Sequence, residues 1–210
     1  MIYLIYKMEN NDPSQLVQKK VVLMGNTAVG KTSIFNQIIS NTFLEDGVSS
    51  TAAVYRAKIM EVPGFPKKLK MNLWDTAGQE KFQSLTKMYV QDAVGVILVY
   101  DMTYAESLEG VLAWYKMAKE HMDLTQSVVC LVGNKCDKMD SIQVTNKAAA
   151  EMGKQINAAI TLEVSAKDRI NIEELFDKLA ALLMQLEERQ RSESVMLKNR
   201  PVQKEKKGCC

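Results

Sequence analysis

The stretch Gly25-Asn26-Thr27-Ala28-Val29-Gly30-Lys31-Thr32 decides the fold, because it matches the pattern G-x-x-x-x-G-K-[ST] of a phosphate-binding loop. A short apolar run over 21–24 precedes it, and a helical pattern over 31–39 follows it. In such a loop the backbone N–H groups and the positive end of the new helix converge on phosphate oxygens. The order of strand, glycine loop and helix therefore predicts a phosphate site at the start of an α/β domain.

Two side chains of this stretch suit a bound nucleotide. Lys31 supplies a mobile cation for the β- and γ-phosphates, and the hydroxyl of Thr32 can ligate Mg²⁺. The residues expected to contact the nucleotide here are Gly25, Asn26, Thr27, Ala28, Val29, Gly30, Lys31, Thr32 and Ser33. The loop alone does not separate a GTPase from an ATPase or a small-molecule kinase.

The rest of the chain alternates strand-like and helix-like segments. Apolar runs predict strands at 21–24, 54–62, 69–74, 94–100, 128–132 and 160–164. Helical spacing predicts helices at 31–39, 106–121, 145–153 and 172–188, the second announced by the capping-box sequence Thr103-Tyr104-Ala105-Glu106. The turn residues at 63–66 predict an antiparallel hairpin, and right-handed crossovers make the other strands parallel. We expect an α/β fold with a six-stranded, mostly parallel sheet and helices on both faces.

A second motif, Asp75-Thr76-Ala77-Gly78-Gln79, ends the strand expected at 69–74. A carboxylate there is placed to hold Mg²⁺ through water, because this ion keeps much of its hydration shell. The N–H of Gly78 could contact a γ-phosphate oxygen, and the amide of Gln79 could orient an attacking water. Phosphoryl transfer is catalysed mainly by positioning and charge stabilisation, so no strong base is needed. We expect Asp75 to bind the metal and Gln79 to be the catalytic residue.

A third motif, Asn134-Lys135-Cys136-Asp137, follows the strand expected at 128–132. The Asp137 carboxylate can accept hydrogen bonds from guanine N1–H and the 2-amino group, whereas adenine would leave the carboxylate unpaired. Asn134 can brace the loops, and the stem of Lys135 can lie over the base. The turn Ser165-Ala166-Lys167 could bring a backbone N–H to guanine O6. These residues predict guanine as the base.

With these motifs in order, the sequence resembles a Ras-superfamily small GTPase of the Rab family over about residues 20–188. Further Rab-like details are Trp74 and the run from Glu80 to Phe82, Ser84-Leu85-Thr86, Tyr89 and the stretch from Leu98 to Thr103. The resemblance implies a P-loop NTPase fold, bound GTP or GDP with Mg²⁺, slow GTP hydrolysis and a role in vesicle transport. It also implies that Phe43 packs against the guanine. The terminal pair Cys209-Cys210 resembles the digeranylgeranylated ends of Rab proteins.

The first switch departs from the Rab pattern, which is Thr-Ile-Gly-hydrophobic-acid-Phe. This chain has Ser49-Ser50-Thr51-Ala52-Ala53-Val54-Tyr55-Arg56 instead. Counting without gaps puts Ser50 in the place of the threonine that closes on Mg²⁺, whereas residue type favours Thr51. Either hydroxyl could ligate the metal and contact the nucleotide. Because the acid and the glycine are absent, the identity of Rab effectors does not carry over.

Charge is distributed unevenly along the chain. Residues 189–210 hold seven basic and two acidic residues, which leaves 20 basic and 23 acidic residues of the total 27 and 25 in positions 1–188. An acidic body with a basic end does not suit a nucleic-acid binder but suits contact with an anionic surface. We expect a flexible extension at 1–18, a GTPase domain at 19–188 and a flexible tail at 189–210. Two lipids on Cys209 and Cys210 beside basic residues would anchor the tail to a membrane.

Composition narrows the class further. Apolar residues at 47% and charged residues at 25% are typical of a globular domain, and no apolar stretch reaches the length of a membrane span or of a signal sequence. Four cysteines, Cys130, Cys136, Cys209 and Cys210, do not form a disulfide framework, which suits a reducing compartment. One histidine, His121, excludes a histidine-rich metal cluster.

The sequence thus predicts a monomeric GTP/GDP switch on the cytoplasmic face of intracellular membranes, with a cytosolic pool. By resemblance, its partners are an exchange factor, a GTPase-activating protein, effectors, a prenylation escort and a GDP-dissociation inhibitor. The alternatives are a nucleotide-locked scaffold that never cycles, an ATP-dependent kinase, and a Ras-like signalling GTPase with a different lipid. Single-turnover hydrolysis would test the scaffold, and replacement of Asp137 would test the kinase. The mass of the C-terminal peptide would identify a different lipid.

Overall fold

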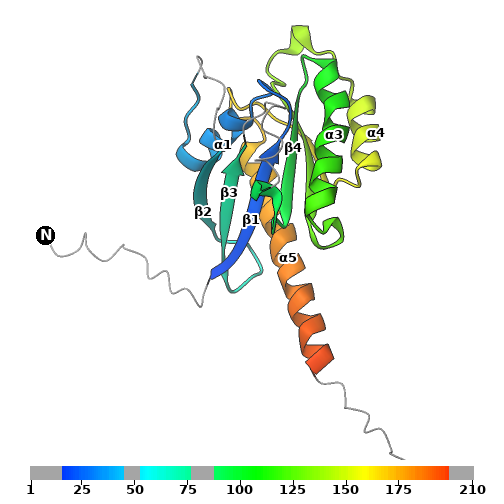
Figure 1. Cartoon of the computed structure of the whole chain (residues 1–210). Coiled ribbons are helices and arrows are strands. Elements are labelled where there is room, and N and C mark those ends of the chain that lie inside the picture. The colour runs from blue at the N-terminus through cyan, green and yellow to red at the C-terminus, as the bar shows by residue number, and fades with distance from the viewer. Residues whose placement is uncertain (1–15, 45–52, 77–87, 199–210) are drawn as a thin grey trace, which may run out of the picture.

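A central sheet carries the molecule. The structure is a computed structural model that describes residues 16–44, 53–76 and 88–198. Its six strands are β1 (Leu16–Met24), β2 (Val54–Met60), β3 (Lys68–Asp75), β4 (Gly95–Asp101), β5 (Val128–Asn134) and β6 (Ile160–Glu163). They lie in the order β2-β3-β1-β4-β5-β6, of which Figure 1 labels the first four. Only the β2–β3 pair is antiparallel, as the sequence predicted.

Helices cover both faces of the sheet. They are α1 (Lys31–Ser40), α3 (Ala105–His121), α4 (Asn146–Gln155) and α5 (Ile172–Lys198), with short 3₁₀ turns η3 (Leu124–Gln126) and η4 (Met139–Ser141). One core cluster joins the sheet to α1 and α5, and a second joins it to α3 and α4. No helix within the described ranges is long and apolar enough to cross a membrane.

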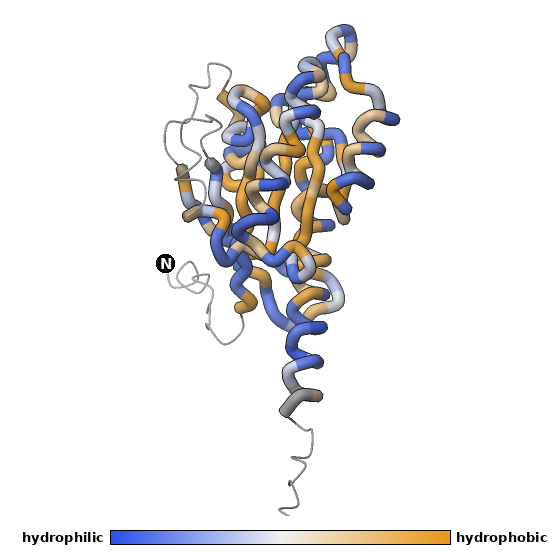
Figure 2. The backbone as a smooth tube through the Cα atoms, turned by 45° about the vertical axis from the view of Figure 1, so that its right-hand side comes forward, coloured by the Kyte–Doolittle hydropathy of each residue, from blue (hydrophilic) through white to orange (hydrophobic). Residues whose placement is uncertain are grey.

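The strand sequences explain this layering. Every residue of β4 and β5 is buried, as expected for parallel strands covered on both faces. In β3, fully buried residues alternate with partly exposed ones. Figure 2 shows the central strands as the apolar part of the chain, with mixed hydropathy along the helices. Because five strands are parallel, their carboxyl ends meet at one edge of the sheet, where ligands of such folds bind.

The two ends of the folded domain differ from the prediction. Strand β1 starts at Leu16, so residues 16–18 belong to the sheet and not to a flexible extension. Helix α5 continues to Lys198, through ten residues that we placed in the flexible tail. A contact between β1 and α5 helps explain both, since the Lys19 ammonium lies 2.7 Å from a Glu187 carboxylate oxygen. Further along α5, the Gln190 side-chain amide donates a hydrogen bond to Gln126 of η3.

The capping box predicted before α3 is wrong. The N-cap residue is Tyr104, and no side chain caps the helix from this position. The Thr103 hydroxyl donates to Asp101 Oδ1 at 2.7 Å instead, and the Ala105 N–H donates to Gln143 Oε1 at 3.2 Å. A long-range partner therefore takes the place of the local cap.

Candidate nucleotide-binding site

The loop between β1 and α1 depends on its two glycines. Gly25 has φ of 147° and Gly30 has φ of 96°, conformations that side chains rarely adopt. A Cβ atom on Gly25 would collide with the carbonyl oxygen of Val99 in β4, and one on Gly30 would collide with the side-chain amide of Asn134. The glycines thus allow the loop to lie directly against the ends of β4 and β5.

Lys31 turns back into this loop. Its ammonium donates to the carbonyl oxygens of Gly25 at 2.9 Å and Asn26 at 2.8 Å, and only 5% of the residue is exposed. Burial lowers the pKa of Lys31 from 10.5 to about 8, against an opposing effect of the Asp75 carboxylate. A buried cation that is hydrogen-bonded to two backbone carbonyls of this loop is suited to meet a phosphate anion.

Thr32 and Asp75 bring two oxygen donors together from distant parts of the chain. The Thr32 hydroxyl donates to Asp75 Oδ2 at 2.7 Å, and Asp75 is completely buried. The next residue, Thr76, fixes the end of β3 through a 2.7 Å hydrogen bond to the Leu23 carbonyl. A hydroxyl and a carboxylate are the hard oxygen ligands that Mg²⁺ prefers, so this donor set fits the ion. Within the described residues, no cluster of three or more His, Cys, Asp or Glu residues offers a second metal site.

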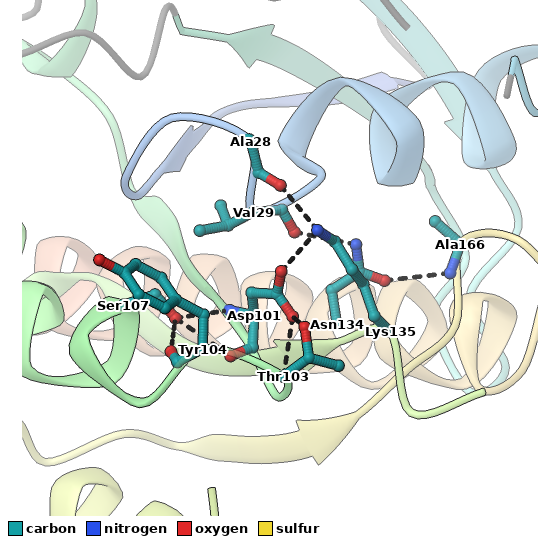
Figure 3. A network of polar contacts seen from close by, with 9 residues as sticks. All are labelled: Ala28, Val29, Asp101, Thr103, Tyr104, Ser107, Asn134, Lys135 and Ala166. Atoms are coloured by element: carbon teal, nitrogen blue, oxygen red, sulfur yellow. Dashed lines mark hydrogen bonds and ion pairs between the residues drawn. The ribbon is translucent and has the colours of Figure 1, made fainter. Parts of the chain in front are cut away.

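Asn134 connects the loop after β1 with the loop after β6. Its side-chain amide donates to the Val29 carbonyl at 3.0 Å, and its Oδ1 accepts from the Ala166 N–H at 3.1 Å (Figure 3). The residue is 2% exposed. The predicted bracing role of Asn134 is therefore confirmed. In this arrangement the Ala166 N–H, which we expected near guanine O6, donates to Asn134.

Ser165 and Asp137 also meet. The Ser165 hydroxyl donates to Asp137 Oδ1 at 2.7 Å and accepts from the Asp168 N–H at 3.0 Å. Ser165 is fully buried, so its position is fixed by the fold. One oxygen of the Asp137 carboxylate is thereby oriented, which is what a carboxylate that recognises a base edge requires.

Sequence reasoning missed Gln37. This residue of α1 is 5% exposed, and its amide donates to the Ala166 carbonyl at 2.6 Å. The signal was available, because Gln37 falls between Ile34 and Ile38 on the buried face of α1. A buried glutamine needs a partner, and here the partner lies in the loop after β6.

Asp101 was noted only as part of a Rab-like stretch, yet it contacts the site. The Lys135 ammonium lies 2.5 Å from Asp101 Oδ2 and donates to the Ala28 carbonyl at 2.9 Å (Figure 3). An aspartate at the carboxyl end of a strand was the signal that identified Asp75, and the same signal applied to Asp101. The structure therefore adds Asp101 to the residues around Lys135.

The side chain of Asn26 is hydrogen-bonded to helix α3. The Trp114 indole N–H donates to Asn26 Oδ1 at 2.8 Å, and Trp114 is 5% exposed. The side chain of Asn26 thus points to α3, while its carbonyl accepts from Lys31.

The other predicted residues divide into two groups. Phe43 packs at the edge of the core that contains α1, Thr27 and Lys167 are exposed, and Ser33 and Cys136 are half-buried. Outside the described residues lie Ser50, Thr51, Gly78, Gln79, Cys209 and Cys210. Their assigned roles remain predictions.

Comparison with known proteins now adds to this geometry. The model of the Ras family matches residues 20–185. Among curated relatives, Ras-related protein Rab-10 of Diplobatis ommata is 37% identical over 79% of this chain and 81% of its own length. GTP-binding protein YPTM1 of Zea mays is 32% identical over 91% of this chain and 95% of its own length. This chain belongs to the Ras superfamily, in its Rab family.

Ras-related protein Rab-12 of Homo sapiens is 36% identical over 76% of this chain, and the match spans 64% of the relative, less than two thirds of its length. Membership of the Rab family confirms the resemblance noted from the sequence. It also agrees with the observed strand order and with the P-loop NTPase fold.

Proposed function

We propose that this Rab-family protein is a membrane-anchored switch that binds GTP and GDP, hydrolyses GTP slowly and regulates vesicle transport. The observation that carries the proposal is the position of Asn134, which hydrogen-bonds both the phosphate loop and the loop after β6. Through this residue the segments expected to bind phosphate and those expected to bind guanine form one connected site.

Recognition of guanine would depend on Asp137. Ser165 orients one of its oxygens, and the carboxylate can then accept hydrogen bonds from guanine N1–H and the 2-amino group. Adenine presents no matching pair of donors and would leave the carboxylate unpaired, which makes such a site strongly selective. Phe43 and the stem of Lys135 would cover the base, with Lys167 at the rim.

The phosphates would lie over the loop at 25–33. Lys31 would bind the β- and γ-phosphates, and Thr32 with Asp75 would hold Mg²⁺, directly and through water. Bound Mg²⁺ supplies neutralisation of the charge on the β- and γ-phosphates. The predicted residues of the switches complete this site: Ser50 or Thr51 on the metal, Gly78 on the γ-phosphate and Gln79 on the attacking water.

Switching would follow from loss of the γ-phosphate. The segments carrying Ser50, Thr51 and Gly78 are ordered by contacts to Mg²⁺ and γ-phosphate in such proteins, and hydrolysis releases them. The residues assigned to the site include no arginine to neutralise the transition state, so we expect strong dependence on an activating protein, up to about 10⁵-fold.

The proposed location rests on the tail, and the proposed partners rest on the resemblance to Rab proteins. Lipids on Cys209 and Cys210, next to Lys204, Lys206 and Lys207, would hold the protein on the cytoplasmic face of intracellular membranes. A GDP-dissociation inhibitor would maintain a cytosolic pool, and a prenylation escort, an exchange factor, an activating protein and effectors would complete the cycle. The protein would act as a monomer and would not bind nucleic acid.

Calorimetry on the full chain tests the binding part. With Mg²⁺ present, GDP should bind at least roughly 10⁴-fold more tightly than ADP. Removing Mg²⁺ with a chelator should weaken GDP binding. A protein that ignores GDP, or binds ADP equally well, would disprove the proposal.

Single-turnover hydrolysis tests the cycle. Bound GTP should be converted to GDP far more slowly than once per second, and only with Mg²⁺. Absence of hydrolysis over many hours would indicate a nucleotide-locked scaffold instead. Localisation in cells, with and without the substitutions Cys209→Ser and Cys210→Ser, tests the membrane anchor.

A further inference from the structure

Asp101 lies at the centre of a small polar network at the carboxyl end of β4 (Figure 3). Its Oδ1 accepts from the Thr103 N–H at 2.8 Å and from the Thr103 hydroxyl at 2.7 Å. Its Oδ2 lies 2.5 Å from the Lys135 ammonium. Both carboxylate oxygens are therefore engaged, and the turn that follows β4 fixes the direction in which the second oxygen points.

The backbone of this network is fixed as well. The Asp101 N–H donates to the Ser107 hydroxyl oxygen at 2.9 Å, and this hydroxyl lies 2.6 Å from the Tyr104 carbonyl oxygen. In the sheet, Asp101 of β4 is the register partner of Asn134 of β5. The carboxylate is thus presented from the end of a strand, opposite Asn134, which is the last residue of β5 and directly precedes Lys135.

Lys135 needs such support. Its φ is 69°, in the left-handed region that residues other than glycine seldom occupy. Its long side chain is 28% exposed, and its ammonium is held at one end of the loop by Ala28 and Asp101. Each further fixed contact reduces the freedom of a lysine side chain that would otherwise sample many rotamers.

The chain contains a second turn of the same design that lacks a lysine. Asp123 Oδ1 accepts from the Thr125 N–H at 2.9 Å and from the Thr125 hydroxyl at 2.6 Å, as Asp101 does from Thr103. This turn precedes the amino end of β5, at the opposite edge of the sheet from Asp101. The Asp-x-Thr turn is therefore a local structural element, and the contact with Lys135 is what distinguishes Asp101.

We propose that Asp101 is a positioning residue for the base site: it holds the Lys135 ammonium against the phosphate loop, so that the lysine stem covers the bound base and slows nucleotide release. The proposal rests on the proposed function, since it assumes that guanine nucleotide binds beside Lys135. Asp101 does not touch the nucleotide. It acts through Lys135 and, by way of the Ala28 carbonyl, on the loop that binds phosphate.

Release of a fluorescent GDP analogue from the full chain tests this role. Asp101→Asn keeps the shape and the bonds from Thr103 but turns an amide toward the ammonium, so dissociation should accelerate about tenfold or more. The matched control Asp123→Asn removes the charge of the equivalent turn and should leave the rate within twofold. If Asp101→Asn also leaves the rate within twofold, the proposal is overturned.

A double-mutant cycle separates positioning from general structural support. In a protein that carries Lys135→Met, adding Asp101→Asn should change the dissociation rate by no more than twofold. An equal acceleration in both backgrounds would overturn the proposal, because Asp101 would then act without Lys135. If Asp101→Asn does not fold, Thr103→Val gives the same comparison, with an expected acceleration of two- to fivefold only where Lys135 is present.

Base selectivity provides a second readout. Inosine diphosphate lacks the 2-amino group that Asp137 would bind, but it can still lie under the Lys135 stem. Asp101→Asn should therefore weaken GDP and inosine diphosphate by equal factors. A changed ratio would mean that Asp101 acts through Asp137, against the proposal. A wild-type protein that binds neither nucleotide would refute the proposed function itself, and this is seen before any variant is compared.

Discussion

The phosphate half and the base half of the site are built differently. In the phosphate half, Lys31 is bonded to carbonyl oxygens only five and six residues away. In the base half, Asn134 is bonded to Val29, which is 105 residues away, and Ala166 accepts from Gln37 across 129 residues. The loop that carries Lys31 is nearly a local structure apart from its contacts to Asp75 and Trp114, whereas the base half exists only when strands β5 and β6 and helix α1 are in place.

This difference has a consequence for how each half responds to change. Replacing a side chain of a local loop removes contacts to the ligand, but it need not lower the stability of the rest of the fold. In a half assembled from distant segments, losing a hydrogen bond can lower both ligand affinity and the stability of the fold, because the same bond connects two elements. The variants below test this distinction, and they are ordered by the size of the expected effect.

Lys31→Met should have the largest effect on binding. It removes the cation expected on the phosphates, so GDP affinity should fall about a hundredfold, the factor that corresponds to losing charge-assisted hydrogen bonds. The melting temperature of the nucleotide-free protein should not fall, because burial already disfavours the charged lysine and lowers its pKa to about 8. Calorimetry and thermal unfolding measure the two effects. The control is Lys147→Met, which replaces an exposed lysine of α4. If Lys31→Met kept its GDP affinity within threefold, Lys31 would not be a phosphate-binding residue.

Asn134→Ala should affect both halves at once. It leaves the Val29 carbonyl and the Ala166 N–H without their partner in a buried place, at a cost of about 2–3 kcal/mol. We expect GDP affinity to fall by about thirtyfold and the melting temperature to fall by about 4–10 °C. Asn146→Ala, at an exposed position of α4, is the control. Loss of affinity without loss of stability would show that the bridge is not structural.

Ser165→Ala should affect the base half alone. It removes the hydrogen bond that orients Asp137, so GDP affinity should fall about fivefold. Inosine diphosphate, which lacks the 2-amino group, should lose less. Competition binding with both nucleotides gives the ratio, and equal losses would argue that Ser165 does not act through Asp137.

Gln37→Leu should have the smallest effect on binding. It deprives the Ala166 carbonyl of its donor, but it also removes a buried Oε1 that has no hydrogen-bond partner among the described residues. The free energy of unfolding should fall by about 1 kcal/mol, with GDP affinity unchanged within twofold. Denaturant unfolding measures the first quantity. A tenfold loss of GDP affinity would instead show that Gln37 takes part in nucleotide binding.

Most of the fold could be predicted because its signals are local. The apolar runs at 94–100 and 128–132 predict parallel strands without knowledge of their neighbours, and every residue of β4 and β5 is indeed buried. The start of β1 and the end of α5 could not be predicted in this way. Residues 16–20 are polar in part, and they are strand because they pair with β3 and because Lys19 reaches Glu187.

The site shows the same division. Lys31, Thr32 and Asp75 were predicted because each follows directly from a motif at the end of a strand, and the structure brings Thr32 and Asp75 to within hydrogen-bonding distance. Gln37 and Asp101 were missed as supporting residues because they lie outside the motifs, although their partners Ala166 and Lys135 lie within them. The cap expected at Thr103 is absent because the Thr103 hydroxyl hydrogen-bonds to Asp101, two residues earlier, and does not cap the helix.

The order of residues in the chain determined the family, the phosphate loop and the chemistry expected for the base, because a few backbone conformations and side-chain donors at short spacing suffice for these. Only the tertiary structure decided which groups support that chemistry. Hydrogen bonds such as those of Asn134 and Lys135 join loops that are adjacent at one sheet edge but distant in the chain. The physical reason is that a buried polar group must find a partner in space, and sequence distance sets no limit on where that partner lies.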